Sequence, residues 1–144
     1  MAGTAPTNVF EKDGQYLSFT VSTAAIGLGE VVAIDDAAAN SVVTGTAALK
    51  AKAIGVACAG ERFSRTSDDG NVAVGRKITV CTRGVVNVES TAAAIDEGDL
   101  VEGADDGKVV AHTPAAGNYA DVLGIALSSV GASGGVVQIK LFRG

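Results

Sequence analysis

The amino-acid sequence predicts an all-β fold, either a compact β-barrel or a small sandwich, built from two related β units. Three observations support this prediction: similar motifs recur in the same order, strand patterns recur roughly every eight to twelve residues, and helix patterns are few. With 144 residues, the chain is long enough for one domain with a substantial core. We expect a flexible N-terminal arm over residues 1–14 and a single β domain over residues 15–144.

The internal repeat has an offset of about 69 positions. Four segments return in the same order, which makes coincidence a poor explanation. The pairs are Ser22–Ala25 with Ser90–Ala93, Gly29–Val32 with Gly98–Val101, Ile54–Ala57 with Leu123–Ala126, and Ile78–Gly84 with Ile139–Gly144. The repeat predicts one unit over about residues 15–82 and a second over about residues 83–144.

Strand patterns fill the first unit. Alternating residues, or β-branched and aromatic types, mark each expected strand, and turn residues such as Asp69-Gly70 separate them. These strands span residues 16–21, 30–34, 41–44, 53–59, 71–74 and 77–82. Helix-forming composition is confined to residues 46–52, which are too few for a helix that is stable without packing.

The second unit carries the same kind of pattern. Its expected strands span residues 85–88, 100–102, 108–112, 122–127 and 136–142, with a short helix-friendly stretch at 91–95. Gly55 and Gly124 lie at equivalent positions inside apolar strands, where a glycine marks a bend or a close approach of two backbones. Their recurrence predicts a barrel corner.

The N-terminal arm differs in composition from the body. Residues 1–8 are short of strand-forming types, and Asp13-Gly14 predicts a turn before the first strand. Val9 and Phe10 are the two candidate anchors of an arm that binds a partner. The alternative is an ordinary frayed terminus.

A long loop is the main difference between the two units. It lies between Ala59 and Asn71 and contains Arg62, Phe63 and Arg65, whereas the equivalent connection in the second unit is short. An aromatic residue beside arginine is a common interface anchor, and loops often carry function. The alternative is a solvated loop whose phenylalanine folds back onto the body.

The composition argues against several classes of function. The apolar residues are mainly Ala and Val, with four Phe, two Tyr and no Trp, so the core is expected to be thin and a deep aromatic cleft is not. The net charge of −5 and the scattered basic residues disfavour nucleic-acid binding, which needs a concentrated positive face. The sequence contains neither a membrane-spanning apolar run nor a recognisable secretory signal.

The two cysteines are expected to stay reduced. In the repeat, Cys58 aligns with Leu127 and Cys81 aligns with Phe142, so each occupies an apolar position. A buried cysteine behaves as a small hydrophobic residue. Without a secretory signal, a disulfide is the less favoured alternative.

Candidate chemical motifs lack the partners that their chemistry needs. His112 has no nearby ligand cluster for zinc and no nucleophile linked to it by spacing, so a surface or hydrogen-bonded histidine is expected. Two Asp-Asp-Gly sequences, at residues 68–70 and 105–107, lack the alternating oxygen ligands of a calcium loop and predict turns. The Gly-rich residues 131–135 precede a strand, which predicts a hairpin connection and not a phosphate loop.

The order of these pieces resembles that of the small capsid cement, or head decoration, proteins of tailed bacteriophages. The resemblance covers nearly everything from residue 14 onward, and its strength lies in the number and order of short motifs. They are Gly14–Val21, Gly29–Val32, Ile54–Ala57, Gly84–Val88, Gly98–Val101, Leu123–Ala126 and Val136–Leu141. The chain departs from the family in length, because its loop at residues 61–70 and its Ala-rich stretches are longer than the family's usual plan.

The resemblance implies a structural function. Such proteins attach to the outside of an assembled icosahedral head, often as homotrimers, and reinforce the shell against the pressure of the packaged DNA. It implies the major capsid protein as partner and a place on the outer surface of the virion after assembly in the host cytoplasm. It implies no catalytic residue, cofactor or metal, and no direct nucleic-acid or membrane partner. We expect the arm (Val9, Phe10) and the long loop (Arg62, Phe63, Arg65) to contact the shell or neighbouring subunits, because both lie outside the repeated body.

Two other classes of function are less consistent with the sequence. A non-catalytic β-barrel module that binds a small ligand or glycan would need a cavity lined with aromatic residues, and the chain has few. A hydrolase using Cys or His predicts thiol-sensitive turnover, for which the residue spacing gives no reason.

Overall fold

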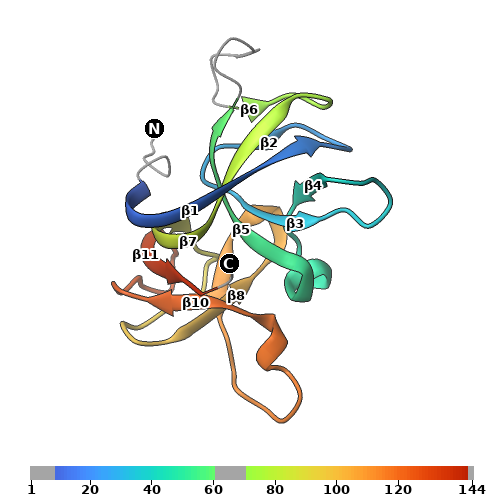
Figure 1. Ribbon diagram of the computed structural model, residues 1–144. Coiled ribbons are helices and arrows are strands. Elements are labelled where there is room, and N and C mark those ends of the chain that lie inside the picture. Colours follow the sequence, from blue (N-terminus) through green and yellow to red (C-terminus); the bar gives the residue numbers. More distant parts are fainter. Residues whose placement is uncertain (1–8, 61–70, 143–144) are drawn as a thin grey trace.

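The computed structural model describes residues 9–60 and 71–142, with side chains from residue 14 onward. In these residues the chain forms eleven strands and three short 3-10 helices (Figure 1). The strands are β1 (Val9–Val21), β2 (Ile26–Gly27), β3 (Val31–Ile34), β4 (Ser41–Thr44), β5 (Ala53–Gly60), β6 (Asn71–Val72), β7 (Lys77–Glu89), β8 (Leu100–Gly103), β9 (Val109–Ala111), β10 (Val122–Ala126) and β11 (Val136–Leu141). The helices are η1 (Ala47–Lys52), η2 (Asp105–Gly107) and η3 (Tyr119–Asp121).

The predicted all-β fold is confirmed. The helix-friendly residues 46–52 form only the 3-10 turns of η1, and residues 91–95 form no helix. Ile95 instead makes an isolated β-bridge with Val130. The alanines there favour a helix, but a segment this short follows the tertiary pairing around it.

The first half of the chain closes into a five-stranded ring. The strand order β1-β4-β3-β5-β7 returns to β1 through an additional β1–β7 pairing. The pairing of β1 with β4 is parallel, whereas the other pairings in the ring are antiparallel. Closure satisfies many of the backbone groups that an open sheet would leave unpaired at its edges, although β1 pairs with β4 only at Thr20 and Val21.

A second ring shares β7 with the first. From β7 the sheet continues through β11, β10 and β8 to β9, and a parallel bridge between Ser90 and Val109 connects β9 back to the end of β7. Figure 1 shows the two rings one above the other, with β7 running from the upper ring into the lower one. The predicted strands 77–82 and 85–88 are therefore one continuous strand, so the expected break between two units at residues 82 and 83 falls inside it.

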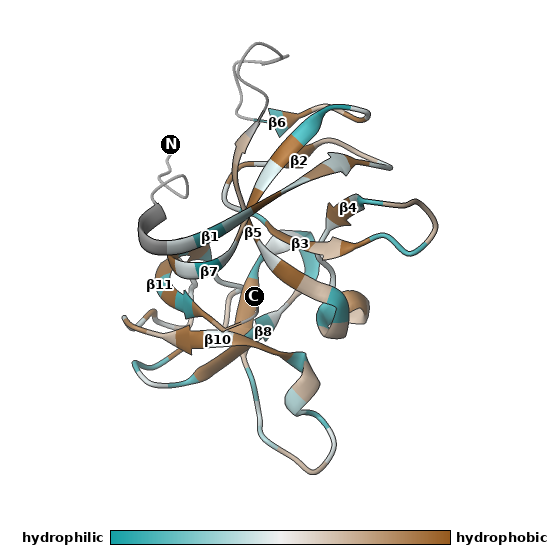
Figure 2. Cartoon of the chain, in the orientation of Figure 1, coloured by the Kyte–Doolittle hydropathy of each residue, from teal (hydrophilic) through white to brown (hydrophobic). Residues whose placement is uncertain are grey.

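Each ring encloses a core of small aliphatic side chains, and Figure 2 shows apolar residues along β5 and β10. One buried cluster contains Val21, Ile26, Val32, Val42, Ala57, Val72, Ile78 and Val80. The other joins the second ring to one side of the first and contains Val31, Ala53, Val56, Cys81, Val86, Val88, Ile95, Val101, Val109, Leu123, Ala126, Val137, Ile139 and Leu141. This second cluster holds the two rings together as one body.

Positions 69 residues apart adopt matching backbone geometry. Gly29 and Gly98 both have positive φ, at 94° and 88°. The amide of Gly29 donates to the carbonyl of Ala57, and the amide of Gly98 donates to that of Ala126. Three cross-strand pairs between β3 and β5 recur 69 positions later between β8 and β10. Val31 with Val56 corresponds to Leu100 with Ile125, Val32 with Gly55 to Val101 with Gly124, and Ala33 with Ala53 to Glu102 with Val122. These correspondences support a duplication, and duplication of the whole unit stays a prediction.

The two strand glycines allow a close approach of neighbouring strands. A Cβ built on Gly55 would lie 2.1 Å from the carbonyl oxygen of Cys81. A Cβ on Gly124 would lie 2.2 Å from the carbonyl oxygen of Lys140. Real Cβ atoms essentially never come this near an oxygen, so only glycine fits at either position.

Candidate functional site

Residues 9–14 of the predicted arm belong to β1. The backbone of Val9 pairs with Val86 and that of Phe10 pairs with Val85, both on β7. The expected strand start after Gly14 is therefore wrong by several residues. The Asp-Gly pair suggested a turn, but the strand continues through an irregular register between Phe10 and Gln15 and keeps its pairing with β7. The side chains of Val9 and Phe10, and all of residues 1–8, lie outside what the structure describes.

The three contact residues predicted in the long loop also lie outside the described residues. Arg62, Phe63 and Arg65 fall between the end of β5 and the start of β6. Their role in contacts therefore stays a prediction. The second Asp-Asp-Gly sequence, at residues 105–107, forms η2 and contains a left-handed Asp106 (φ 61°), so it is the tight turn that the sequence predicts.

Several large apolar side chains are exposed on the described surface. The sequence patterns did not identify them, because local patterns do not show which apolar residues another element covers. They are Tyr16, Leu17, Val74, Tyr119, Leu127, Val136 and Phe142. Tyr16 and Leu17 are adjacent on β1, the strand that begins with the predicted anchors. These two residues therefore extend the candidate contact region from the N-terminus onto the described body.

A polar network connects the two rings. Lys50 of η1 donates to Glu102 Oε2 over 2.8 Å, and the other carboxylate oxygen lies 2.6 Å from His112 Nδ1. Asp121 is a further neighbour, with its carboxylate 3.8 Å from Lys50 Nζ. The side chain of His112 is fully buried, and its Nε2 has no hydrogen-bond partner among the described residues. Sequence reasoning expected a surface or hydrogen-bonded histidine but did not identify Glu102 as its partner.

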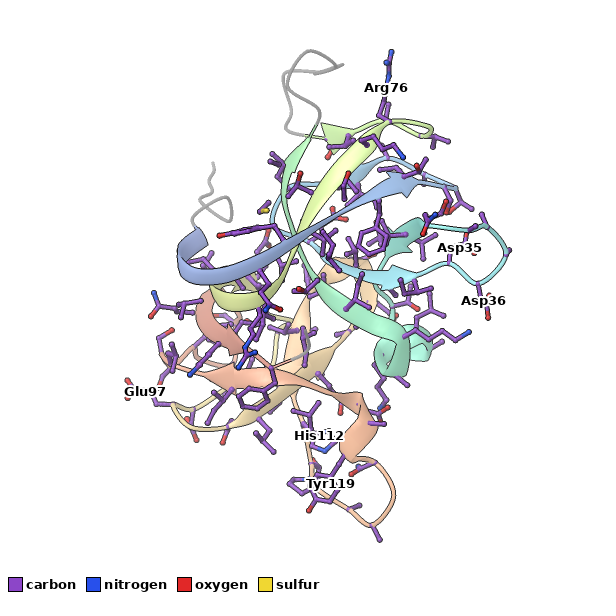
Figure 3. All side chains as sticks on the ribbon, in the orientation of Figure 1. Asp35, Asp36, Arg76, Glu97, His112 and Tyr119 are labelled. Atoms are coloured by element: carbon purple, nitrogen blue, oxygen red, sulfur yellow. The ribbon has the colours of Figure 1, made fainter. Side chains whose placement is uncertain are left out.

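Tyr119 lies beside this network. Its ring centroid is 6.4 Å from that of His112, at an interplanar angle of 47°. Figure 3 shows the two side chains next to each other at the lower end of the second ring. The arrangement holds the imidazole between a carboxylate and an aromatic ring, which fixes its orientation.

Two partly buried carboxylates, Glu30 and Glu102, have pKa values displaced in opposite directions. Burial raises the pKa of Glu30, and the hydrogen bond from Thr44 Oγ1 to Glu30 Oε1 (3.0 Å) only partly opposes it. Burial also acts to raise the pKa of Glu102, but hydrogen bonds to Lys50 and His112 outweigh it and hold that pKa below its ordinary value. The partners of Glu102 thus favour its ionised form, whereas burial of Glu30 outweighs its hydrogen bonds and disfavours the ionised form.

The described residues offer no constellation for metal binding. Within residues 9–60 and 71–142, no group of three or more His, Cys, Asp or Glu side chains is placed to hold a metal ion. His112 has one acidic neighbour, and the remaining polar contacts of the network come from Lys50. The geometry organises the junction of the two rings.

The cysteines do not form a disulfide in the structure. Cys58 Sγ lies 3.4 Å from the carbonyl of Thr79, and Cys81 Sγ lies 3.2 Å from that of Arg83. The alignment of Cys81 with Phe142 is wrong, because strand pairing matches Cys81 with Lys140. Cys81 pairs with Tyr16 and Val56 on its two neighbouring strands. Lys140 pairs with Val85 and Ile125, which lie 69 positions after Tyr16 and Val56. Sequence similarity at the ends of the two strands shifted the alignment by two positions.

None of the helices in the described part of the chain has the length and apolar character needed to cross a membrane.

Comparisons with known proteins identify both the family and the fold. No curated protein sequence matches the chain significantly. Among solved structures, the chain is similar to one from the capsid of Myoviridae phage XM1, with 18% identity and a TM-score of 0.63 over 95% of this chain and 88% of that one. It is also similar to the N base of head fiber gp8.5 of bacteriophage phi29, with 15% identity and a TM-score of 0.51 over 90% of this chain and 95% of that one. At these identities the similarity establishes a shared fold. A family described as structural cement protein (E217 gp24/Pam3 gp6) matches residues 1–142, and the chain therefore belongs to the phage cement protein family.

Proposed function

We propose that this protein binds the outer surface of an assembled icosahedral capsid as a homotrimer and stabilises the shell. Its partner is the major capsid protein, it joins the virion after assembly in the host cytoplasm, and it acts without catalysis or a cofactor. The observation that carries the proposal is the family match over residues 1–142. The acidic, aromatic-poor composition is consistent with a role in protein contacts alone.

The physical properties of the fold suit a cement protein. Two closed rings that share one long strand resist deformation, because a strand in a closed ring cannot leave without breaking hydrogen bonds on both edges. The strand glycines and small aliphatic cores keep the backbones close together. Many copies on a lattice add avidity, so each contact can be modest.

We propose two contact elements for the shell or neighbouring subunits. One is the N-terminal segment that leads to Val9 and Phe10, whose backbone is anchored to β7. The other is the loop with Arg62, Phe63 and Arg65, which joins β5 to β6. Both adjoin strands of the described body in the sequence, and scaffolds of this kind commonly present such segments to partners.

Co-sedimentation with mature capsids stripped of their surface proteins tests the function. We expect saturable binding at a fixed ratio to the major capsid subunit, and a ratio of three copies per site would support the homotrimer. A well-folded protein that does not bind mature heads would contradict the proposal. That result would favour a ligand- or glycan-binding β-barrel.

Two variants test the contact elements. Deleting residues 1–8 leaves the β1–β7 pairing in place and should weaken capsid binding without unfolding the body. Phe63→Ala should also weaken binding, and Val74→Ala is the matched control, because Val74 is an exposed apolar residue outside the loop. If either contact variant binds like the wild type, that element is not a capsid contact.

A further inference from the structure

One edge of β1 lacks a partner strand among the described residues. Its other edge pairs with β7 from Gln15 to Thr20. On the edge in question, β4 pairs only with Thr20 and Val21. The preceding residues, Gln15–Ser18, are exposed to solvent.

The backbone groups of this edge point away from β7. The amide of Val21 donates to Arg76 on the β7 side, whereas the amide of Thr20 donates to Asn40 on the β4 side. Because successive residues of a strand point their amides to opposite edges, Tyr16 and Ser18 direct their N–H and C=O groups to the uncovered edge. They present hydrogen-bonding groups that another strand can use.

The second ring shows what covers an edge of this kind. Leu17 pairs with Val80, and Val86 pairs with Ile139, which places Leu17 and Val86 at equivalent positions 69 residues apart. On its other edge Val86 pairs with Val9, in antiparallel orientation. Leu17 has no such second neighbour within residues 9–60 and 71–142. The strand that covers the equivalent edge is thus the beginning of β1 itself.

The exposure of the side chains differs in the same way as the pairing of the two edges. The side chain of Val86 is fully buried, whereas that of Leu17 is 53% exposed. The neighbouring Tyr16 is 38% exposed, and its counterpart Val85 is half-buried. An uncovered edge with exposed apolar side chains is a site where strands associate.

Most of the usual protection of an exposed edge is missing from Gln15–Ser18. Natural edge strands carry charged residues, proline or bulges that prevent pairing with another chain. The segment Gln15–Ser18 contains neither a charged residue nor proline. Its one irregularity, the register shift between Gln15 and Tyr16, lies at its beginning. Within residues 9–60 and 71–142, nothing therefore prevents this edge from accepting a strand.

We propose that this edge of β1 pairs with the same edge of a second copy of the chain. In an antiparallel pair related by a two-fold axis, opposite residues have their side chains on the same face of the sheet. A residue must therefore pair either with itself in the second copy or with a residue an even number of positions away. Pairing Tyr16 with Ser18 of the second copy satisfies this condition and places Leu17 opposite its own copy. The pairing brings no like charges together and covers both leucines.

Self-pairing goes beyond the proposed attachment to capsids, because it connects copies of the chain to one another. A contact of a few residues buries less than the roughly 1,000 Å² of a stable interface, so free copies associate weakly. Copies held side by side on a lattice have a high local concentration, which strengthens the contact. Two-fold contacts of this kind would link neighbouring assemblies into a net.

Cross-linking tests the register directly. Leu17→Cys, oxidised at high protein concentration without capsids, should give a disulfide-linked dimer joined through position 17, identified by mass spectrometry. Val136→Cys is the matched control, because Val136 is a similarly exposed strand residue at 44%. Equal cross-linking of the two variants would overturn the proposal. The proposal would also be overturned if Leu17→Cys bound to capsids formed cross-links only to the shell protein.

A charge-reversal pair tests the energetics. Leu17→Lys places two positive charges opposite each other and should weaken self-association about tenfold or more, measured by sedimentation equilibrium. Leu17→Glu should do the same alone, and mixing the two variants should restore association through unlike pairs. Failure of the mixture to associate better than either variant would contradict the pairing. Because capsids are absent, the outcome is independent of whether the protein binds them.

Discussion

Replacing Gly55 by alanine should destabilise the protein strongly, because the new methyl group would meet the backbone of the neighbouring strand. The added Cβ would lie 2.1 Å from the carbonyl oxygen of Cys81, whereas carbon and oxygen atoms in sheets are ordinarily about 3.3 Å apart or more. The obstacle is a backbone carbonyl and not the end of a flexible side chain. Strands β5 and β7 would have to separate by about 1 Å to accommodate it.

The cost has two parts. Overpacking of this kind typically costs about 1–3 kcal/mol, and each ladder hydrogen bond lost as the strands separate costs about 1 kcal/mol more. Loss of backbone freedom in the unfolded alanine variant offsets about 0.4–1 kcal/mol. We expect Gly55→Ala to lower the free energy of unfolding by about 3 kcal/mol, a large share of the stability of a typical domain.

Urea unfolding followed by far-ultraviolet circular dichroism measures this change, since the chain has no Trp to report by fluorescence. Gly124→Ala should cost a similar amount, because its Cβ would lie 2.2 Å from the carbonyl of Lys140. Gly131→Ala is the matched control, because no atom lies within 4 Å of its added Cβ. A Gly55→Ala variant within about 1 kcal/mol of the wild type would refute the reasoning.

Two glutamates give further predictions, with opposite dependence on pH. Glu102→Gln should lower the free energy of unfolding by about 1–2 kcal/mol at neutral pH, because the charged hydrogen bonds to Lys50 and His112 are lost. The pKa of Glu102 is lowered in the folded state, so the stability advantage of the wild type over Glu102→Gln should disappear as the pH falls below the ordinary value of 4.5. A stability difference that persists in full in acid would contradict the lowered pKa. Burial raises the pKa of Glu30, so its protonated form favours folding, and the stability of the wild type relative to Glu30→Gln should decrease as the pH rises through and above 4.5. Urea titrations across this pH range would show the trend, and a stability difference for Glu30→Gln that does not change with pH would argue against a raised pKa.

Sequence patterns predicted the strands better than their pairing. The turns at Asp105–Gly107 and the short strands around them follow from local residue preferences, so they could be predicted. The continuity of β7 could not, because Gly84 has the composition of a break but retains its pairing with Leu141. Whether a glycine interrupts a strand depends on the neighbouring strands, which a local pattern does not contain.

The candidate contact region shows the same division. The sequence indicated Val9 and Phe10 as anchors, because they are apolar residues in a polar segment. It did not indicate that their backbone pairs with β7, nor that Leu17 would be exposed although it belongs to an alternating strand. Alternation shows which face of a strand a residue occupies, but not whether another element covers that face.

By itself, the sequence determined the all-β class, the recurrence at 69 positions, the two strand glycines and a resemblance that led to the cement family. These depend on composition, local preference and spacing, which the chain carries at every position. Only the tertiary structure decided that two rings share β7 and that Lys50, Glu102 and His112 meet between them. It also decided that no strand of the described residues covers one edge of β1 at Gln15–Ser18. Such features arise where segments distant in the sequence meet, and the free energy of those contacts is not present in either segment alone.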